Sequence, residues 1–342
     1  MLHSVRVGIV GCGMIANIHA HAIRQVEGLA LAGACSRSDA SAEKFCAAQN
    51  IRKYDSYADM LASEEIDAVS LCTPSGDHCG QILRALEAGK HVIVEKPMCI
   101  TLDECDQVLR KAEGTGLTVC VISQHRFSDG IQEIKRAIDA GEPGKIHSAQ
   151  LTMHYFRPQE YYDSAAWRGT WALDGGGVLM NQGIHGVDML CYLLGKPQAV
   201  TGFITTSGRN IEVEDTAAAA VRFESGVIGT IDASTCCAPG FPQRIVISCE
   251  KGRIVTQDDY IMEWTLPSPC QTEVGTPGGG SGAGDPKAIF MENHTRQFRD
   301  FANAVLRGDP LNSGPREGTL PLEIILGIYE SSRSGKTVKI ER

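Results

Sequence analysis

The segment GGGVLMNQGIH, residues 175–185, joins three glycines to an apolar run that carries an asparagine and a histidine. Glycines let a backbone turn sharply or approach another group closely. Beyond them, polar residues recur at spacings of four, three and four, which correspond to one face of a helix. These residues are Asn181, His185, Asp188 and Tyr192. The pattern predicts a buried helix with one polar stripe, and such a stripe needs polar partners or a cleft.

A glycine-rich turn follows the apolar run VRVGIV near the N-terminus. It reads Gly11-Cys-Gly13-Met-Ile-Ala16, a GxGxxA pattern that opens a predicted helix. The glycines let the backbone approach a pyrophosphate, and the small Ala16 lets the helix pack closely on the strand. The first helical N–H groups, at Met14 and Ile15, are available to a phosphate. At the first strand of an alternating series, this motif predicts dinucleotide binding.

The second apolar run ends at Ser36 and Arg37, where the adenosine ribose of a dinucleotide is expected to lie. An acidic residue at this point favours NAD, because a carboxylate can bond both ribose hydroxyls. Ser36 and Arg37 suit a 2′-phosphate instead, so the sequence favours NADP slightly over NAD. Asp39 is close in the sequence, so NAD remains the alternative cofactor. The alternative interpretation of Arg37 is a solvated residue at the start of a helix.

Two later strand ends also carry polar residues. Thr73 and Pro74 end one strand, at the edge where open parallel sheets bind ligands, and His78 follows them. His78 either caps this loop or contacts the cofactor or the second domain. Another strand, HVIV, ends in Glu95 and Lys96. A lysine there is costly unless it faces a cleft, where burial lowers the pKa of a lysine toward neutrality; the alternative is a side chain that reaches the surface.

Together these motifs resemble one family. GxGxxA near the N-terminus, EKP further on and GGGxxxxxxxH in the second half are similar to the glucose-fructose oxidoreductase and inositol dehydrogenase (Gfo/Idh/MocA) family. The resemblance extends to MENHTRQFRDFANAVLRG and YESSRSGKTV near the C-terminus. The stretch WRGTWALDGGGVLMNQGIHGVDML looks most like the nucleotide-sugar and glycoside 3-dehydrogenase branch. The resemblance implies a nicotinamide-dependent reaction on a sugar or polyol.

The resemblance also implies roles for single residues. Lys96 corresponds to the EKP lysine near nicotinamide and substrate, and His185 to the active-site histidine. Many members carry an aspartate four residues before that histidine, where this chain has Asn181. An amide can hold a hydroxyl but cannot take its proton, so acid-base work is expected to rest on Lys96 and His185. Gln182 and Asp188 are expected to orient His185 or the substrate, with a structural pairing as the alternative for Asp188.

Other side chains are candidates for the substrate cleft. Trp167 and Arg168 offer a flat apolar wall and a cation, a pair that suits a sugar ring or a phosphate; ordinary sheet packing is the equal alternative. Gln124 is a further cofactor candidate, and Arg126 and Tyr155 are further substrate candidates.

Composition limits the class of protein. Of the 342 residues 21% are charged, with 32 basic against 41 acidic side chains and a net charge of -9. That balance argues against nucleic-acid and anionic-membrane partners. Thirteen scattered cysteines, an odd number without CxxC, favour reduced thiols over disulfides or a structural zinc site. With no signal peptide or membrane-length apolar run, we expect a cytoplasmic protein.

Hydrophobic patterning predicts an α/β fold with two domains. Residues 1–122 alternate short apolar runs with amphipathic stretches, which is typical of a Rossmann domain with a parallel sheet. Residues 123–342 read as an α/β domain with an open, mostly antiparallel sheet for substrate binding and for assembly into a homodimer or homotetramer. Two helices are expected to close the chain, with Asn293 and His294 at a helix start or interface. Residues 267–286, which contain GGGSGAG, are expected to form a mobile loop.

The sequence therefore predicts an NAD(P)-dependent dehydrogenase. Its substrate would be a secondary hydroxyl of a sugar, glycoside, nucleotide sugar or inositol-like polyol, with no metal required. A non-catalytic dinucleotide sensor of the same fold is the alternative, and the presence of both Lys96 and His185 disfavours it.

Overall fold

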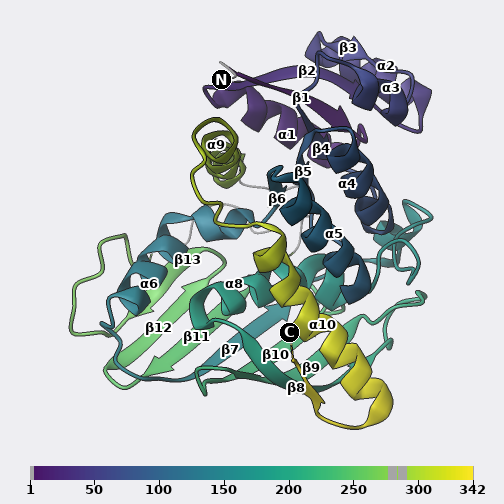
Figure 1. Cartoon of the computed structure of the whole chain (residues 1–342). Helices are drawn as coiled ribbons and strands as arrows, with labels where there is room; N and C mark the ends of the chain where they lie inside the picture. The colour runs from purple at the N-terminus through teal and green to yellow at the C-terminus, as the bar shows by residue number, and fades with distance from the viewer. Residues whose placement is uncertain (1–3, 276–282, 284–290, 342) are drawn as a thin grey trace. The chain divides into compact units, whose positions relative to one another are not determined.

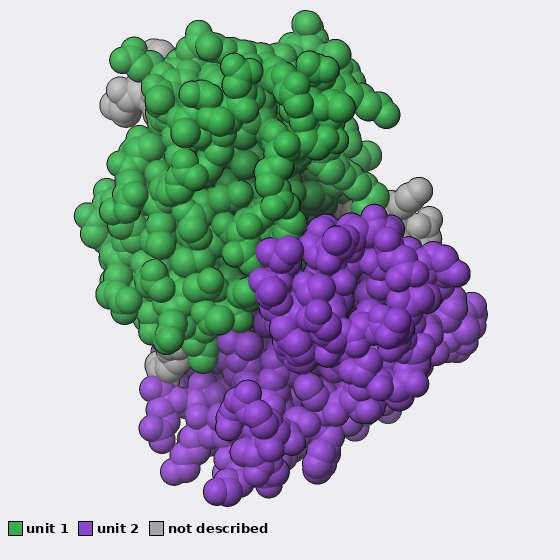
Figure 2. Space-filling model, turned by 90° about the vertical axis from the view of Figure 1, so that its right-hand side faces the viewer, with its two compact units in different colours: residues 1–124, 290–319 green, residues 125–289, 320–342 purple. Residues whose placement is uncertain are grey.

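The chain divides into two compact units, coloured green and purple in Figure 2. The computed structural model describes residues 4–275, 283 and 291–341. The first unit comprises residues 1–124 and 290–319, and the second comprises residues 125–289 and 320–342. The units are therefore not two consecutive halves, because a segment near the C-terminus returns to the first.

The first unit is built on a parallel sheet of six strands in the order β3-β2-β1-β4-β5-β6. These strands are β1 (Val5–Val10), β2 (Leu29–Cys35), β3 (Arg52–Lys53), β4 (Ala68–Leu71), β5 (His91–Val94) and β6 (Val119–Val121). The central strands are mostly apolar and buried, because helices cover both faces of a parallel sheet. The predicted Rossmann-type sheet is confirmed, although the short β3 was not predicted.

Helices connect these strands as the alternating pattern predicts. They are α1 (Met14–Gln25), α2 (Asp39–Gln49), α3 (Tyr57–Ala62), α4 (His78–Glu87) and α5 (Leu102–Thr115), with a short 3-10 turn η1 (Ser75–Asp77) before α4. The six-residue α3 was not predicted. Within the described residues, none of the helices is long and apolar enough to cross a membrane.

Helix α9 (Met291–Arg307) joins the first unit from near the end of the chain. It lies beside α1 (Figure 1). Phe298 and Phe301 of α9 share one apolar core with Val7 and Ile9 of β1. Burial of two phenylalanines stabilises this docking by a few kcal/mol, which fixes the neighbouring residues of α9 against the sheet.

The second unit contains a sheet of eight strands in the order β13-β12-β11-β7-β10-β9-β8-β14. Only the β7–β10 pair among these described strands is parallel. The strands are β7 (Ile146–His154), β8 (Pro197–Thr205), β9 (Thr216–Phe223), β10 (Ile228–Ser234), β11 (Arg244–Cys249), β12 (Gly252–Gln257), β13 (Tyr260–Trp264) and β14 (Val338–Lys339). The predicted mostly antiparallel sheet is confirmed.

The helical elements of this part of the chain are short, apart from the last. They are η2 (Gln124–Phe127), α6 (Asp129–Asp139), α7 (Gln159–Asp163), η3 (Val178–Gly183), α8 (Ile184–Leu194) and α10 (Pro315–Ser334). Of the predicted 267–286 loop, residues 276–282 and 284–286 lie outside the described residues.

The predicted helix at residues 175–194 is not uniform. A π-helical turn, η3, comes first, and the regular helix α8 begins at Ile184. A Cβ atom at Gly177 would lie 1.7 Å from the Glu214 carbonyl oxygen. The backbone here therefore packs directly on another part of the same unit, and only glycine permits that approach.

Candidate active site

The turn between β1 and α1 has the geometry of a phosphate-binding loop. Gly11 adopts φ +91°, and a Cβ atom there would lie 2.7 Å from the Cys72 carbonyl oxygen. At Gly13 a Cβ atom would meet nothing within 4 Å, so the space beside this residue is open. Met14 and Ile15 begin α1, and the Met14 side chain is half exposed. Backbone N–H groups at a helix start can bind an anion such as the pyrophosphate of a dinucleotide.

Gly13→Val tests this loop. The valine would fit without a clash because the space at Gly13 is open, and it would fill the space that a pyrophosphate needs. We expect the variant to fold with an unchanged melting temperature and to lose dinucleotide binding, measured by calorimetric titration with NADH and NADPH. Unchanged affinity in the folded variant would contradict the loop's assignment.

The segment after β2 carries an exposed arginine and an aspartate that is already paired. The Arg37 side chain is 75% exposed, and its nearest ion partner is Asp77 at 3.7 Å. Asp39, the residue whose carboxylate made NAD the alternative cofactor, forms an ion pair with Lys53. Ser36 is half-buried directly after the strand. This arrangement leaves Arg37 accessible to a 2′-phosphate and gives Asp39 another partner.

The loops after β4 and β5 are joined by His78. Its ring is buried, with Nδ1 2.8 Å from the Pro97 carbonyl oxygen and Nε2 2.9 Å from the Thr73 carbonyl oxygen. Lys96, which precedes Pro97 in the chain, is half-buried. His78 thus bridges two strand ends, a role closer to the predicted loop cap than to a ligand contact.

Glu95 connects the backbone at Lys96 to the buried His19 side chain. Its Oε2 accepts the Lys96 backbone N–H at 3.2 Å, and its Oε1 lies 2.9 Å from His19 Nε2. Burial raises the pKa of Glu95, but the hydrogen bond and charge of His19 outweigh it and lower the pKa to about 2. Burial lowers the pKa of His19, while Cys72 and Glu95 raise it to about 10. A buried ion pair therefore supports the backbone at Lys96.

In the second unit, Asn181, His185 and Tyr192 of the polar stripe are half-buried, and Asp188 is buried. The His185 ring meets the His125 ring edge-on, with centroids 4.7 Å apart. His125 Nδ1 lies 2.7 Å from Asp259 Oδ1. Burial lowers the pKa of His125, but Asp259 outweighs it and raises the pKa. His125 was not among the predicted site residues, although it lies between the candidates Gln124 and Arg126 in the sequence.

The amide at Asn181 has a specific partner. Its Nδ2 donates to Asp174 Oδ1 at 2.9 Å, and Asp174 Oδ2 accepts the Gly169 backbone N–H at 2.9 Å. Asp174 is buried. An aspartate at position 181 would place two carboxylates together, so the amide here matches the neighbouring carboxylate.

Asp188 of the polar stripe forms an ion pair with Arg126, which belongs to the same unit. Asp188 accepts two hydrogen bonds from the Arg126 guanidinium, at 2.8 Å from Nε and 2.5 Å from Nη2. Both side chains are buried, and the guanidinium lies over the Tyr192 ring, 5.0 Å from its centroid. Arg126, predicted to bind substrate, is thus held in a buried ion pair, and the structural alternative for Asp188 describes its contacts.

Tyr161 contacts two other candidate residues, Arg168 and Gln182. The Arg168 guanidinium lies 4.3 Å from the Tyr161 ring centroid and 4.6 Å from the Trp167 ring centroid. Gln182 Nε2 donates to the Tyr161 hydroxyl at 3.4 Å. The predicted Trp167–Arg168 pair is therefore a stacked aromatic and cationic cluster, and Tyr161 is a member that sequence analysis missed.

Tyr155 and Gln124 are the two remaining candidates. Tyr155 is packed under the Arg157 guanidinium, 5.4 Å from its ring centroid, and burial raises the pKa of its hydroxyl. Gln124 is the last residue of the first unit's N-terminal segment, and its Oε1 is buried with no hydrogen-bond partner among the described residues. A buried amide oxygen of this kind needs a donor, which suits its predicted place in a ligand site.

Glu214 organises the backbone that leads to Asn181. Its carboxylate accepts N–H groups from Gly177 at 2.8 Å and Leu179 at 2.9 Å, and the Tyr329 hydroxyl at 2.9 Å. Burial raises the pKa of Glu214 to about 7, although these hydrogen bonds oppose the shift.

This shift predicts a pH dependence of stability. The folded chain holds the Glu214 proton more tightly than the unfolded chain, so this contribution is full below the ordinary carboxyl pKa and is lost as pH rises through about 7. The loss between about pH 5 and about pH 8 should be about 2 kcal/mol. Denaturant unfolding at both pH values should show it in the natural chain and not in Glu214→Gln. Equal pH dependence of the two proteins would contradict the assignment.

Comparison with known proteins agrees with this geometry. Residues 5–123 match the oxidoreductase family with an NAD-binding Rossmann fold. Residues 131–255 match the GFO/IDH/MocA C-terminal domain. The two matches fall on the parallel sheet and on most of the second sheet.

The relatives match different shares of this chain. The WlbA dehydrogenase from Bordetella pertussis, solved with NADH and UDP-GlcNAcA, is 31% identical, with 99% of each chain covered and a TM-score of 0.88. The scyllo-inositol 2-dehydrogenase (NAD(+)) of Bacillus subtilis (strain 168) is 28% identical over 100% of this chain and 98% of its own. The scyllo-inositol 2-dehydrogenase (NADP(+)) of the same organism is 28% identical over 62% of this chain and 58% of its own. With both sheets, the glycine turn and these matches in agreement, the chain belongs to the GFO/IDH/MocA family of NAD-binding oxidoreductases.

Proposed function

We propose that this protein is an NAD(P)-dependent dehydrogenase that oxidises a secondary hydroxyl of a sugar or polyol, or reduces the corresponding ketone. One observation carries the proposal. Lys96 follows a buried strand at the carboxyl edge of a dinucleotide-binding sheet, and its backbone is fixed by a buried glutamate. That edge is where open parallel sheets bind their ligands.

The residues of the first unit fit a nicotinamide dinucleotide. Open space at Gly13 and the start of α1 suit the pyrophosphate, and the buried Gln124 Oε1 can accept a hydrogen bond from the cofactor. When bound, the nicotinamide supplies the hydride chemistry at C4.

The protein's part is proton transfer and positioning. Lys96 takes the proton of the substrate hydroxyl at Nζ, and His185 hydrogen-bonds the same oxygen. In the reverse direction Lys96 returns the proton, and its positive charge stabilises the alkoxide as it forms. Asn181 holds a neighbouring hydroxyl through its amide oxygen, since its Nδ2 donates to Asp174.

Contacts in the second unit and the names of the relatives support the proposed substrate class. Trp167 and Arg168 stack with Tyr161, which offers an apolar wall and a cation to a sugar ring or a phosphate. Relatives act on inositols, and one is solved with UDP-GlcNAcA. We therefore propose a nucleotide sugar, glycoside or inositol as substrate.

We also propose that the protein assembles into a dimer or tetramer through the second sheet, where Phe203 of β8 is 73% exposed.

A substrate screen tests the proposal directly. The natural chain would be mixed with NAD or NADP and with separate nucleotide sugars, glycosides and inositols, while absorbance of the reduced cofactor is followed. We expect cofactor reduction with members of one of these classes. Tight dinucleotide binding without turnover on the panel in either direction would favour a non-catalytic sensor instead.

Arg37→Ala tests the cofactor preference. We propose that NADP binds at least as well as NAD, because the exposed Arg37 can pair with the 2′-phosphate. The variant should lose about 1 to 3 kcal/mol of NADP binding free energy, the scale of a charged hydrogen bond. NAD affinity should barely change in the same calorimetric titration. Equal losses for both cofactors would mean that Arg37 acts structurally.

A further inference from the structure

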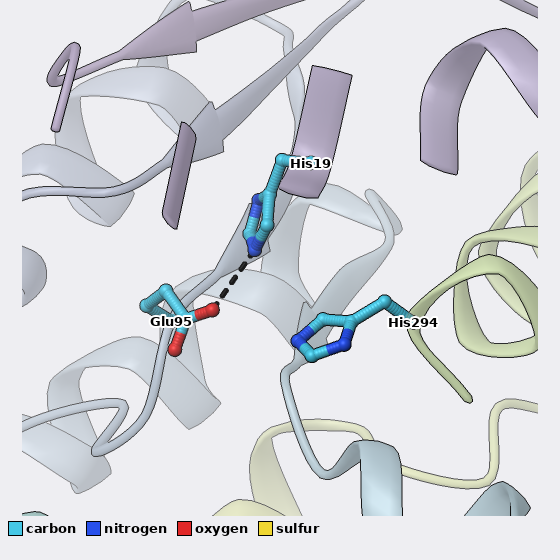
Figure 3. A group of neighbouring side chains, drawn as sticks. All are labelled: His19, Glu95 and His294. Carbon is cyan, nitrogen blue, oxygen red and sulfur yellow. Dashed lines mark hydrogen bonds and ion pairs between the residues drawn. The ribbon is translucent and has the colours of Figure 1, made fainter. Parts of the chain in front are cut away.

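Three buried side chains of the first unit converge on one point. His19 comes from α1, Glu95 from the end of β5 and His294 from α9 (Figure 3). One donor atom from each, an imidazole nitrogen or a carboxylate oxygen, lies within 4.8 Å of the other two. Their exposed fractions are 0%, 8% and 1%. Three distant segments of the chain therefore supply one buried group of nitrogen and oxygen donors.

The outer atoms of this group are held by other residues. His19 Nδ1 lies 2.7 Å from the Ser70 hydroxyl oxygen, and Glu95 Oε2 accepts the Lys96 N–H at 3.2 Å. These contacts direct His19 Nε2 and Glu95 Oε1 toward each other, 2.9 Å apart. The His19 ring also packs edge-on against Phe298, with centroids 5.0 Å apart. Outer partners of this kind fix the ring and carboxylate orientation at metal centres.

We infer that His19, Glu95 and His294 form a site for a divalent transition-metal ion of the zinc class. Two imidazoles and one carboxylate suit Zn²⁺, whereas Mg²⁺ and Ca²⁺ prefer oxygen donors. Bonds of about 2.1 Å in a tetrahedral site place donor atoms about 3.4 Å apart. The three donors, already within 4.8 Å of one another, reach that spacing with small shifts of the side chains.

The ion would join α9 to the sheet next to the Lys96 loop. His294 is on α9, Glu95 precedes Lys96, and His19 is on the helix that follows the glycine turn. Because an unfolded chain does not bring these donors together, the ion would stabilise the folded unit in proportion to the logarithm of its concentration. The inference does not depend on the proposed dehydrogenase activity.

The test uses the purified full chain, stripped with a chelator and then titrated with Zn²⁺ alone. We expect one Zn²⁺ per chain to be retained after gel filtration, measured by mass spectrometry of the metal, and a rise in melting temperature. His294→Gln should lower the affinity at least tenfold, since removal of even an outer partner often costs that much. His21→Gln is the matched control, because this exposed histidine lies on the same helix as His19; it should bind Zn²⁺ like the natural chain.

Two results would overturn the site. One is a folded natural chain that retains no stoichiometric Zn²⁺, which would leave His19 and Glu95 as an ion pair only. The other is equal Zn²⁺ affinity in His294→Gln and the natural chain. If His294→Gln does not fold, Co²⁺ added to the natural chain decides instead: a visible spectrum typical of tetrahedral coordination supports the site, and its absence contradicts it. None of these measurements requires a substrate or a dinucleotide.

Discussion

Lys96→Met and His185→Ala should each lower turnover at least 100-fold while leaving dinucleotide affinity nearly unchanged. Loss of a positioned acid-base group costs about two to four orders of magnitude in rate. Methionine keeps the length of the lysine side chain without its proton-accepting amine. The measurement is kcat for the substrate found in the screen, together with a calorimetric titration of the cofactor.

Matched variants separate catalysis from general damage. Lys44→Met changes an exposed lysine of the first unit, and His147→Ala an exposed histidine of the second; both should keep turnover within a factor of about two. Near-normal turnover in His185→Ala would mean that the polar stripe serves helix packing against His125. An experimental structure with His185 more than about 10 Å from the Lys96 amine, beyond one bridging water, would also end the shared-site proposal.

Arg126→Met should destabilise the protein by about 3 to 5 kcal/mol, the usual cost of breaking a buried ion pair from one side. The variant leaves the Asp188 carboxylate buried without its two guanidinium hydrogen bonds. Denaturant unfolding followed by fluorescence and circular dichroism would report the change as a lower midpoint. Asp188→Asn should also destabilise, since it removes the buried carboxylate that pairs with the Arg126 guanidinium.

Two further variants show whether burial is the cause. In the double variant Arg126→Met, Asp188→Leu both charges are absent, so part of the lost stability should return. Arg253→Met removes an exposed ion pair with Glu263 on the second sheet and should change the midpoint little. A small effect of Arg126→Met, similar to that of Arg253→Met, would show that solvent reaches Asp188 in the folded protein.

Local pattern was sufficient for the main elements and for the loops that end them. Mostly apolar runs such as VRVGIV predict buried parallel strands, because such strands face helices on both sides. The glycine turn could also be predicted from the sequence. Gly11 has a positive φ and Gly13 leaves open space beside the backbone, and glycine meets both requirements through its own local geometry. Short elements such as β3 and α3 were missed because a few residues carry too little periodicity to be recognised.

The sequence by itself thus determined the two sheets, the glycine turn and the position of Lys96 after a buried strand. Only the tertiary structure decided which polar groups meet. His294 lies close to Glu95 because two phenylalanines of α9 dock in the first unit, and Arg126 bonds Asp188 across a sequence separation of 62 residues. Contacts between residues far apart in the chain depend on how complete surfaces pack, and no local preference of either residue encodes them.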